Sequence, residues 1–212
     1  MKKLNRVDQL IVNFDQGLRT LFGKPLATAR PNPANSQEEA NLTASEQQLA
    51  MRLMRVNHAG EVSAQALYQG QALTARTEIV QENMYRSAME ENDHLEWCRE
   101  RVQELHGHVS LFNPMWYAGS FAIGALAGAA GDKWSLGFVA ETEKQVVKHI
   151  DEHLTRLPVQ DDKTRAILEQ MKEDEAHHAT VALDIGGVDL PKPISWMMSK
   201  VSKVMTKTAF WV

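Results

Sequence analysis

Six glutamate and histidine residues form a repeated pattern of the kind that binds metal ions. A lone glutamate is followed about thirty residues later by a Glu-x-x-His step, and the same order then occurs again. The six residues are Glu61, Glu91, His94, Glu143, Glu175 and His178. The lone glutamate leads its partner by 30 residues in the first copy and by 32 in the second. Four-helix bundles use this ligand set to hold two metal ions.

The residue types and their spacing fit a di-metal site. Glutamate at i and histidine at i+3 lie on one face of a helix, so both can reach a single ion. Carboxylate and imidazole suit iron or manganese, whereas the absence of thiolate argues against zinc ribbons and iron–sulfur clusters. Four carboxylates balance the charge of two divalent ions. Without metal, four carboxylates in a bundle core would have to protonate or would unfold the site.

Three further residues are candidates for contacts with the ligands, namely His58, Tyr68 and His149. His58 lies close to Glu61 along the chain. His149 is one position short of an inward position and can orient a ligand by a hydrogen bond, with a surface site as the alternative. Tyr68 is a core residue on this pattern, with a hydrogen bond to the site as the alternative. Glu90 falls off the inward stripe and is expected on a solvated face.

Four long helices with inward-facing stripes would position the six residues. On each stripe the ionisable residues stand in register with Leu, Val and Met, as core residues do. We expect the first helix to begin at the capping box Thr43-Ala-Ser-Glu46 and the second to span roughly 77–106. The third helix should run from near Ser135 to Pro158, and the fourth from about 162 to 185.

The bulk composition limits the class of protein. The chain has 212 residues, enough for one domain with a sizeable core and appendages. A net charge of −4 is too near neutral to suggest a nucleic-acid binder. The single cysteine, Cys98, excludes a disulfide framework and fits a reducing compartment. The N-terminal stretch lacks an uninterrupted apolar region, so we expect no secretory signal.

The patterns divide the chain into three parts. Residues 1–42 are expected to form a short amphipathic helix over 3–22 and then a linker, and residues 43–189 the metal-binding bundle. Residues 190–212 carry four lysines, no acid and an apolar side. That composition indicates a basic amphipathic helix suited to an anionic membrane surface. A helix that docks on the bundle is the alternative.

An uncharged segment rich in alanine and glycine, residues 109–131, joins the two halves of the bundle. A bundle of two hairpins needs a long crossover at this point. Pro114 leaves about 17 apolar residues before Asp132, the lower limit for a spanning helix. A single span would separate the halves of the metal site by the membrane. We therefore expect a membrane-associating crossover in the form of an embedded or interfacial hairpin.

Several motifs together resemble the demethoxyubiquinone hydroxylase family, membrane-associated di-iron monooxygenases of ubiquinone biosynthesis. The resemblance covers roughly residues 45–190 and includes the crossover, but it leaves out residues 1–42. The family often has His-Tyr where this chain has His149-Ile150, so any role for that tyrosine is absent here. The matching stretches are Arg55-Val-Asn-His-Ala-Gly-Glu61, Tyr68-Gln-Gly-Gln71, Glu91-Asn-Asp-His94-Leu95, Asn113-Pro-Met-Trp116, Val139-Ala-Glu-Thr-Glu143 and Asp174-Glu-Ala-His-His178.

The resemblance implies an all-α, ferritin-like four-helix bundle with two iron ions per subunit. Some of the glutamates would bridge the two ions. The stripe on the third helix and the six-residue step to His149 select Glu143 over Glu141. The ligands it implies are Glu61, Glu91 and His94 for one iron and Glu143, Glu175 and His178 for the other.

The resemblance also implies an activity, the O₂-dependent hydroxylation of the ring of a polyprenyl demethoxyubiquinol, the penultimate step of ubiquinone biosynthesis. NADH, a reductase and the quinol itself stay open as electron donors, since the chain has no nucleotide-binding glycine fingerprint. The polyprenyl tail places the protein at the cytoplasmic face of the inner (cell) membrane, as a peripheral or monotopic protein. Other ubiquinone-biosynthesis proteins and further copies of the chain stay open as partners.

Two other classes share part of the pattern. A ferritin-like iron store or peroxidase uses the same ligand logic, but it needs neither an uncharged crossover nor a basic tail. A non-catalytic membrane protein that binds quinone or lipid needs no ionisable groups on its core stripes. Iron content and detergent dependence separate these three classes.

Overall fold

Every regular element of the computed structural model, which describes residues 6–212, is a helix. The predicted all-α fold is therefore confirmed. The expected start of the first helix at residue 3 lies outside the described residues. In chain order the elements are α1 (Arg6–Phe22), the short 3₁₀ helix η1 (Pro33–Ser36), α2 (Ala44–Thr74), α3 (Glu78–Glu104), α4 (Asn113–Ala130), α5 (Asp132–Arg156), α6 (Asp162–Asp184) and α7 (Lys192–Trp211).

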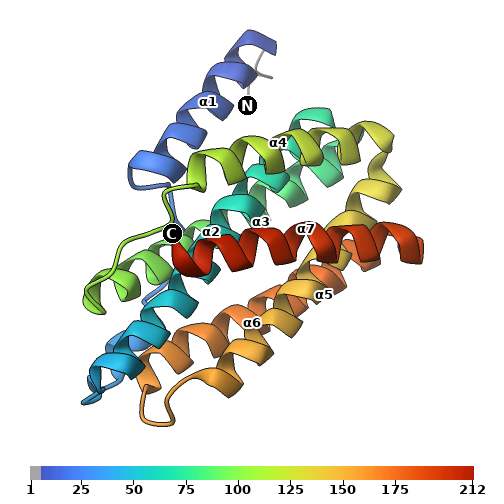
Figure 1. Cartoon of the computed structure of the whole chain (residues 1–212). Helices are drawn as coiled ribbons and strands as arrows, with labels where there is room; N and C mark the ends of the chain where they lie inside the picture. The colour runs from blue at the N-terminus through green and yellow to red at the C-terminus, as the bar shows by residue number, and fades with distance from the viewer. Residues whose placement is uncertain (1–5) are drawn as a thin grey trace.

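Four of these helices form a bundle of two hairpins, α2 with α3 and α5 with α6 (Figure 1). The predicted capping box begins α2, because the Thr43 N–H donates to Glu46 Oε2 at 2.9 Å. Asp161 caps α6 by accepting a hydrogen bond from the Thr164 N–H at 3.2 Å. Such caps satisfy N–H groups that the first helical turn leaves without partners. The hairpins fix which faces of the four helices meet.

The bundle core consists of two apolar clusters with a polar layer between them. Leu53 and Met171 belong to the first cluster, and Met84 and Val139 belong to the second. Each apolar side chain of this size contributes about 1.5–3 kcal/mol by leaving water. Along each helix of the bundle, the residues of the repeated pattern lie between the two clusters. The apolar layers therefore stabilise the fold and keep the polar layer away from solvent.

The crossover is one continuous helix, α4, so the expected hairpin is wrong. Pro114 stands in the first turn, where a missing N–H is tolerated, and Gly131 ends the helix at a φ of 116°. No proline interrupts the alanine-rich stretch between them. α4 lies along α2 (Figure 1). A Cβ on Gly70 of α2 or on Gly124 of α4 would overlap the opposite backbone, so these glycines permit the close approach.

α7 packs on the outside of the bundle, against α2. Its fully buried Ala209 lies beside Val56 and Ala59, so the helix docks on the bundle, as the alternative interpretation of the tail expected. Its larger apolar side chains still face outward. The exposed ones are Ile194, Trp196, Met197, Val201, Val204 and Trp211. No helix within residues 6–212 is long and apolar enough to cross a membrane.

Candidate metal centre

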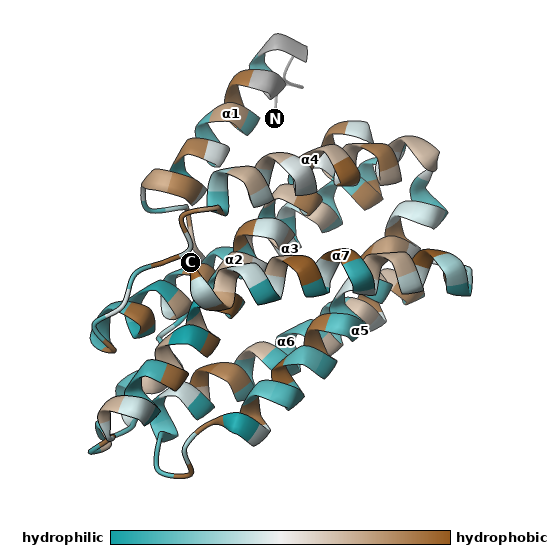
Figure 2. Cartoon of the chain, in the orientation of Figure 1, coloured by the Kyte–Doolittle hydropathy of each residue, from teal (hydrophilic) through white to brown (hydrophobic). Residues whose placement is uncertain are grey.

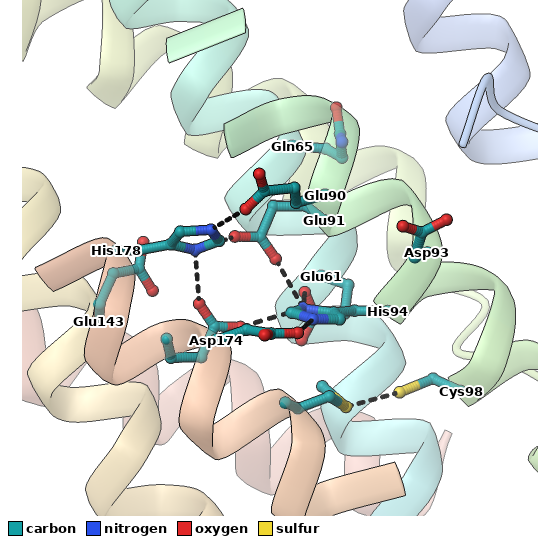
Figure 3. A network of polar contacts seen from close by, with 12 residues as sticks. Glu61, Gln65, Glu90, Glu91, Asp93, His94, Cys98, Glu143, Asp174 and His178 are labelled. Atoms are coloured by element: carbon teal, nitrogen blue, oxygen red, sulfur yellow. Dashed lines mark hydrogen bonds and ion pairs between the residues drawn. The ribbon is translucent and has the colours of Figure 1, made fainter. Parts of the chain in front are cut away.

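The six residues of the repeated pattern meet in the polar layer of the bundle, and Figure 3 labels all of them except Glu175. Each of the four bundle helices contributes at least one of them. None exposes more than 5% of its surface. They are Glu61 on α2, Glu91 and His94 on α3, Glu143 on α5, and Glu175 and His178 on α6.

One half of the centre surrounds the Nδ1 atom of His94. Glu91 Oε2 lies 3.1 Å from this nitrogen and Glu175 Oε1 lies 3.2 Å from it. Glu61 Oε2 is 3.9 Å away. The ligating atoms of these four residues all lie within 4.8 Å of one another, which is close enough for one metal ion to reach them all.

The other half of the centre surrounds the Nδ1 atom of His178. Glu91 Oε1 lies 3.1 Å and Glu175 Oε2 lies 3.2 Å from this nitrogen. Glu91 and Glu175 therefore each present one oxygen to either histidine, so both carboxylates join the two halves of the centre. Glu143 lies beside His178 in Figure 3 and accepts a hydrogen bond from the Tyr68 hydroxyl at 2.7 Å. The structure thus places Tyr68 in contact with a candidate ligand.

A second carboxylate fixes each histidine from the far side of its ring. The Nε2–H of His94 donates to Asp174 Oδ2 at 2.8 Å, and that of His178 donates to Glu90 Oε2 at 2.7 Å. Each of these acids belongs to the opposite helix, and both bonds leave Nδ1 free to face the centre. The Glu90 side chain is 31% exposed, so the expected solvated face is confirmed only in part, because its Oε2 is turned inward to His178. The signal in the sequence was an acid directly before both Glu-x-x-His steps.

The structure places the remaining candidates away from the six residues. The ring of His149 lies against His153, with centroids 3.9 Å apart, because a six-residue step from Glu143 turns it off the inward face. His58 is buried against α4 and accepts a hydrogen bond from Asn113 Nδ2 at 3.3 Å. Within the described residues, neither histidine has a hydrogen bond or ion pair with the six. Burial lowers the pKa of His58 to about 3, so it stays neutral.

Burial dominates the electrostatics of the carboxyl groups. It raises the pKa of Glu61 and of Glu143, and the neighbouring carboxylates of Glu91 and Glu175 raise both further. Burial would also raise the pKa of Glu91, but hydrogen bonds from the two histidines outweigh it and lower that pKa. Glu91 therefore carries the negative charge between the imidazoles, while Glu61 and Glu143 hold protons.

Both histidines are held in the charged form when no metal is present. Burial disfavours the imidazolium, yet hydrogen bonds to the surrounding carboxylates raise the pKa of His94 and of His178 above the usual value. Without metal, the protons on the two imidazoles and on Glu61 and Glu143 thus neutralise the charge that metal cations would otherwise neutralise. Metal ligands must be ionised carboxylates and neutral imidazoles, so metal binding has to release these protons.

The donor set fits divalent transition-metal ions. Glu61 Oε2 is buried 3.9 Å from His94 Nδ1 and has no hydrogen-bond partner among the described residues, so this oxygen is available to a metal ion once the carboxyl group loses its proton. Carboxylates and imidazoles without thiolate favour iron or manganese. Cys98 is buried behind the site and lies 3.7 Å from Met171 Sδ, where it takes no part in the cluster. The buried cluster can therefore hold metal.

Fold and site together define a ferritin-like helical bundle with a carboxylate–histidine centre. A solved structure agrees with this class. The bacterioferritin-related thioferritin of Bacteroides fragilis superposes with a TM-score of 0.54 over 75% of this chain and 92% of its own, at 18% sequence identity. At that identity the likeness concerns the fold alone.

Sequence comparison then gives the family. The family model described as "Ubiquinone biosynthesis protein COQ7" matches residues 48–209, and the chain belongs to this family. A protein of Nitrosococcus oceani named 3-demethoxyubiquinol 3-hydroxylase is 61% identical over 100% of this chain and 99% of its own length. A protein of the same name from Acinetobacter baumannii is 53% identical over the full length of both chains. The family expected from the motifs is therefore confirmed.

Replacing Glu143 should abolish metal retention, whereas replacing its neighbour Glu141 should not. Glu143 is buried in the centre, but Glu141 is half-buried outside it and accepts a hydrogen bond from Gln145 Nε2 at 2.6 Å. Iron per chain, measured after anaerobic loading and desalting, should fall more than about tenfold in Glu143→Ala. Glu141→Ala should match the parent. Equal losses in both variants would contradict the assignment.

Metal affinity should rise with pH, because the groups with raised pKa values must lose protons to bind metal. Calorimetric titration with Co²⁺ at about pH 6 to 8, in buffers of different ionisation enthalpy, measures both the affinity and the protons released. His177→Ala is the matched control, since His177 is exposed beside His178. An affinity independent of pH with no proton release would show that the apo site does not hold these protons.

The same pKa shifts should make the folding stability of the metal-free protein fall with rising pH, whereas its metal affinity should rise. Folded-state pKa values lie above the usual 4.5 for Glu61 and Glu143 and above 6.5 for His94. This stabilisation is fully present below those usual values and is lost as pH rises through the raised ones. The melting temperature of the metal-free chain should therefore fall from pH 6 to pH 8, and added Co²⁺ should restore more of it at pH 8.

Proposed function

We propose that this protein is a 3-demethoxyubiquinol 3-hydroxylase, an O₂-dependent di-iron monooxygenase acting on the ring of a polyprenyl demethoxyubiquinol. One observation carries the proposal. A chain 53–61% identical, along its whole length, to proteins of that name also buries a complete carboxylate–histidine ligand set in one cluster. Family membership supports a place in ubiquinone biosynthesis, and the cluster supports an oxidative step that uses metal.

Each side chain of the centre has a separate task in this proposal. Glu91 and Glu175 lie between the two histidines and would help to hold the metal. The ligands of one ion would be Glu61, Glu91 and His94, and those of the other Glu143, Glu175 and His178. Iron in such a donor set supplies the redox chemistry with which dioxygen is activated.

Tyr68 holds Glu143 in place and keeps its own proton. Burial raises the pKa of Tyr68 well above the usual value, and the Glu143 carboxylate raises it further when it is ionised, so the Tyr68 hydroxyl donates to Glu143 Oε1 at any physiological pH. A crevice between α2 and α5 leads to both residues and is lined by Leu67, Gln71 and Thr142. We propose that the quinol ring enters through this crevice. Because the crevice leaves almost no free volume, side chains such as Leu67 would have to move first.

We further propose that the protein works at the surface of the inner (cell) membrane, on its cytoplasmic face. A polyprenyl quinol partitions into lipid, so its enzyme must reach the bilayer. Support comes from exposed apolar side chains on α1, α4 and α7, among them Phe14, Leu126 and Val204. Figure 2 shows that α4 is mostly apolar, whereas α5 and α6 carry many hydrophilic residues. The lysines of α7 would meet anionic head groups.

The apolar face of α7 gives a direct test of membrane association. Val201→Asp and Val204→Asp place charges on this face, where valines are 54% and 61% exposed, and should lower flotation with anionic vesicles several-fold. Val159→Asp is the matched control, because Val159 is 85% exposed in the α5–α6 connection. Equal flotation of all three variants with the parent would refute the proposed surface.

The activity itself is tested by isotope incorporation. Iron-loaded, reduced protein mixed with a demethoxyubiquinol and ¹⁸O₂ should give a product heavier by one ¹⁸O atom, detected by mass spectrometry. Glu175→Ala should give no product, because its carboxylate lies between both histidines. An iron-loaded, reduced protein that leaves the substrate unchanged would refute the proposed activity. Accumulation of many iron atoms per chain would instead favour an iron store.

A further inference from the structure

Arg30 lies in the linker between α1 and α2, outside the segment that the family model matches, and reaches the edge of the metal centre. Its Nε is 3.2 Å from Asp93 Oδ2 on α3, and its Nη1 is 2.9 Å from Asp174 Oδ2 on α6. The guanidinium therefore joins the two helices that carry the Glu-x-x-His steps. Asp174 is the carboxylate that accepts the Nε2–H of His94.

We propose that Arg30 is a positioning residue for the metal centre, which holds Asp174 so that His94 keeps its Nδ1 turned toward the ions. This inference rests on the proposed function. Asp174 Oδ2 is bound at once by Arg30 and by His94, so the arginine fixes the oxygen that fixes the imidazole. The guanidinium also lies 5.1 Å from the centroid of the Trp97 ring, which in turn lies against His94.

Arginine suits this place better than lysine would. Its planar fork offers two separate donors, one to each aspartate, which a single ammonium group cannot match in geometry. The Asp93 side chain is only 2% exposed and needs a partner for its charge. Thr28 also donates to Asp93, and Asn92 Nδ2 donates to the Leu26 carbonyl at 2.8 Å, so the linker is tied to α3 around Arg30.

Among the described residues, an arginine holds the outer carboxylate on only one half of the centre, where Arg30 contacts Asp174. His178 has its own outer carboxylate, Glu90, but among the described ion pairs Glu90 contacts that histidine and no arginine or lysine. The two halves are therefore inequivalent, although their ligands are alike. Loss of Arg30 should weaken the half around His94 and leave the half around His178 nearly unchanged.

Co²⁺ binding measured by equilibrium dialysis and visible absorption tests this inference without any turnover. Arg30→Met should weaken one of two binding steps about tenfold, the usual effect of losing an outer partner of a ligand. Arg30→Lys should retain only part of the Co²⁺ affinity that Arg30→Met loses. Lys24→Gln is the matched control, since Lys24 lies in the same linker and pairs with Glu96 of α3 at the surface. This variant should bind Co²⁺ like the parent.

A double-mutant cycle separates positioning from simple anchoring of the linker. If Arg30 acts through Asp174, Arg30→Met should have no further effect on Co²⁺ affinity in an Asp174→Asn background. A purely structural role would lower the melting temperature and leave Co²⁺ affinity at the parental value, which would overturn the inference alone. Independent, additive losses would also overturn it. A parent chain that binds no Co²⁺ would overturn the proposed function as well.

Discussion

Four carboxylates are buried at the middle of a helical bundle, and the rest of this structure depends on how their charge is balanced. A buried carboxylate without a cation takes up a proton or requires a charged partner, because low dielectric disfavours its ionised form. In the metal-free protein, protons on His94, His178, Glu61 and Glu143 provide that balance. Two divalent ions would provide the same positive charge. Binding of metal would therefore exchange protons for cations inside a preformed site.

The site is held by contacts that cross the bundle. Asp174 of α6 fixes His94 of α3, and Glu90 of α3 fixes His178 of α6. Each outer acid directly precedes a candidate ligand in sequence. A one-residue change in the register of α3 or α6 would turn each side chain by about 100° and would break the ligand and the outer contact together. The apolar clusters on both sides, with α4 packed along α2, keep these helices in that register.

Helical periodicity in the sequence predicted what depends on position along one helix, and it failed where contacts join distant segments. The stripe of core residues separated Glu143 from Glu141, and the capping box located the start of α2. Glu90 contacts His178, 88 residues further along the chain, and Arg30 contacts Asp93 and Asp174, 63 and 144 residues further along. No local pattern in the sequence encodes such pairings. The alanine–glycine crossover has no clear apolar period, so its form as one helix depended on close packing against α2. His149 lies one position off the stripe, and for such a residue periodicity alone did not decide whether the side chain reaches the centre or, as the structure shows, lies against His153.

The central claim is that the buried cluster is a two-ion centre. Anaerobic equilibrium dialysis of the metal-free chain against ferrous iron tests it most directly, because the count of bound ions needs no substrate, electron donor or membrane. We predict two ferrous ions per chain, with both sites weakened in Glu91→Ala, since Glu91 presents one oxygen to each histidine. Binding of one ion or none by the folded chain, or an unchanged count of two in Glu91→Ala, would contradict the claim.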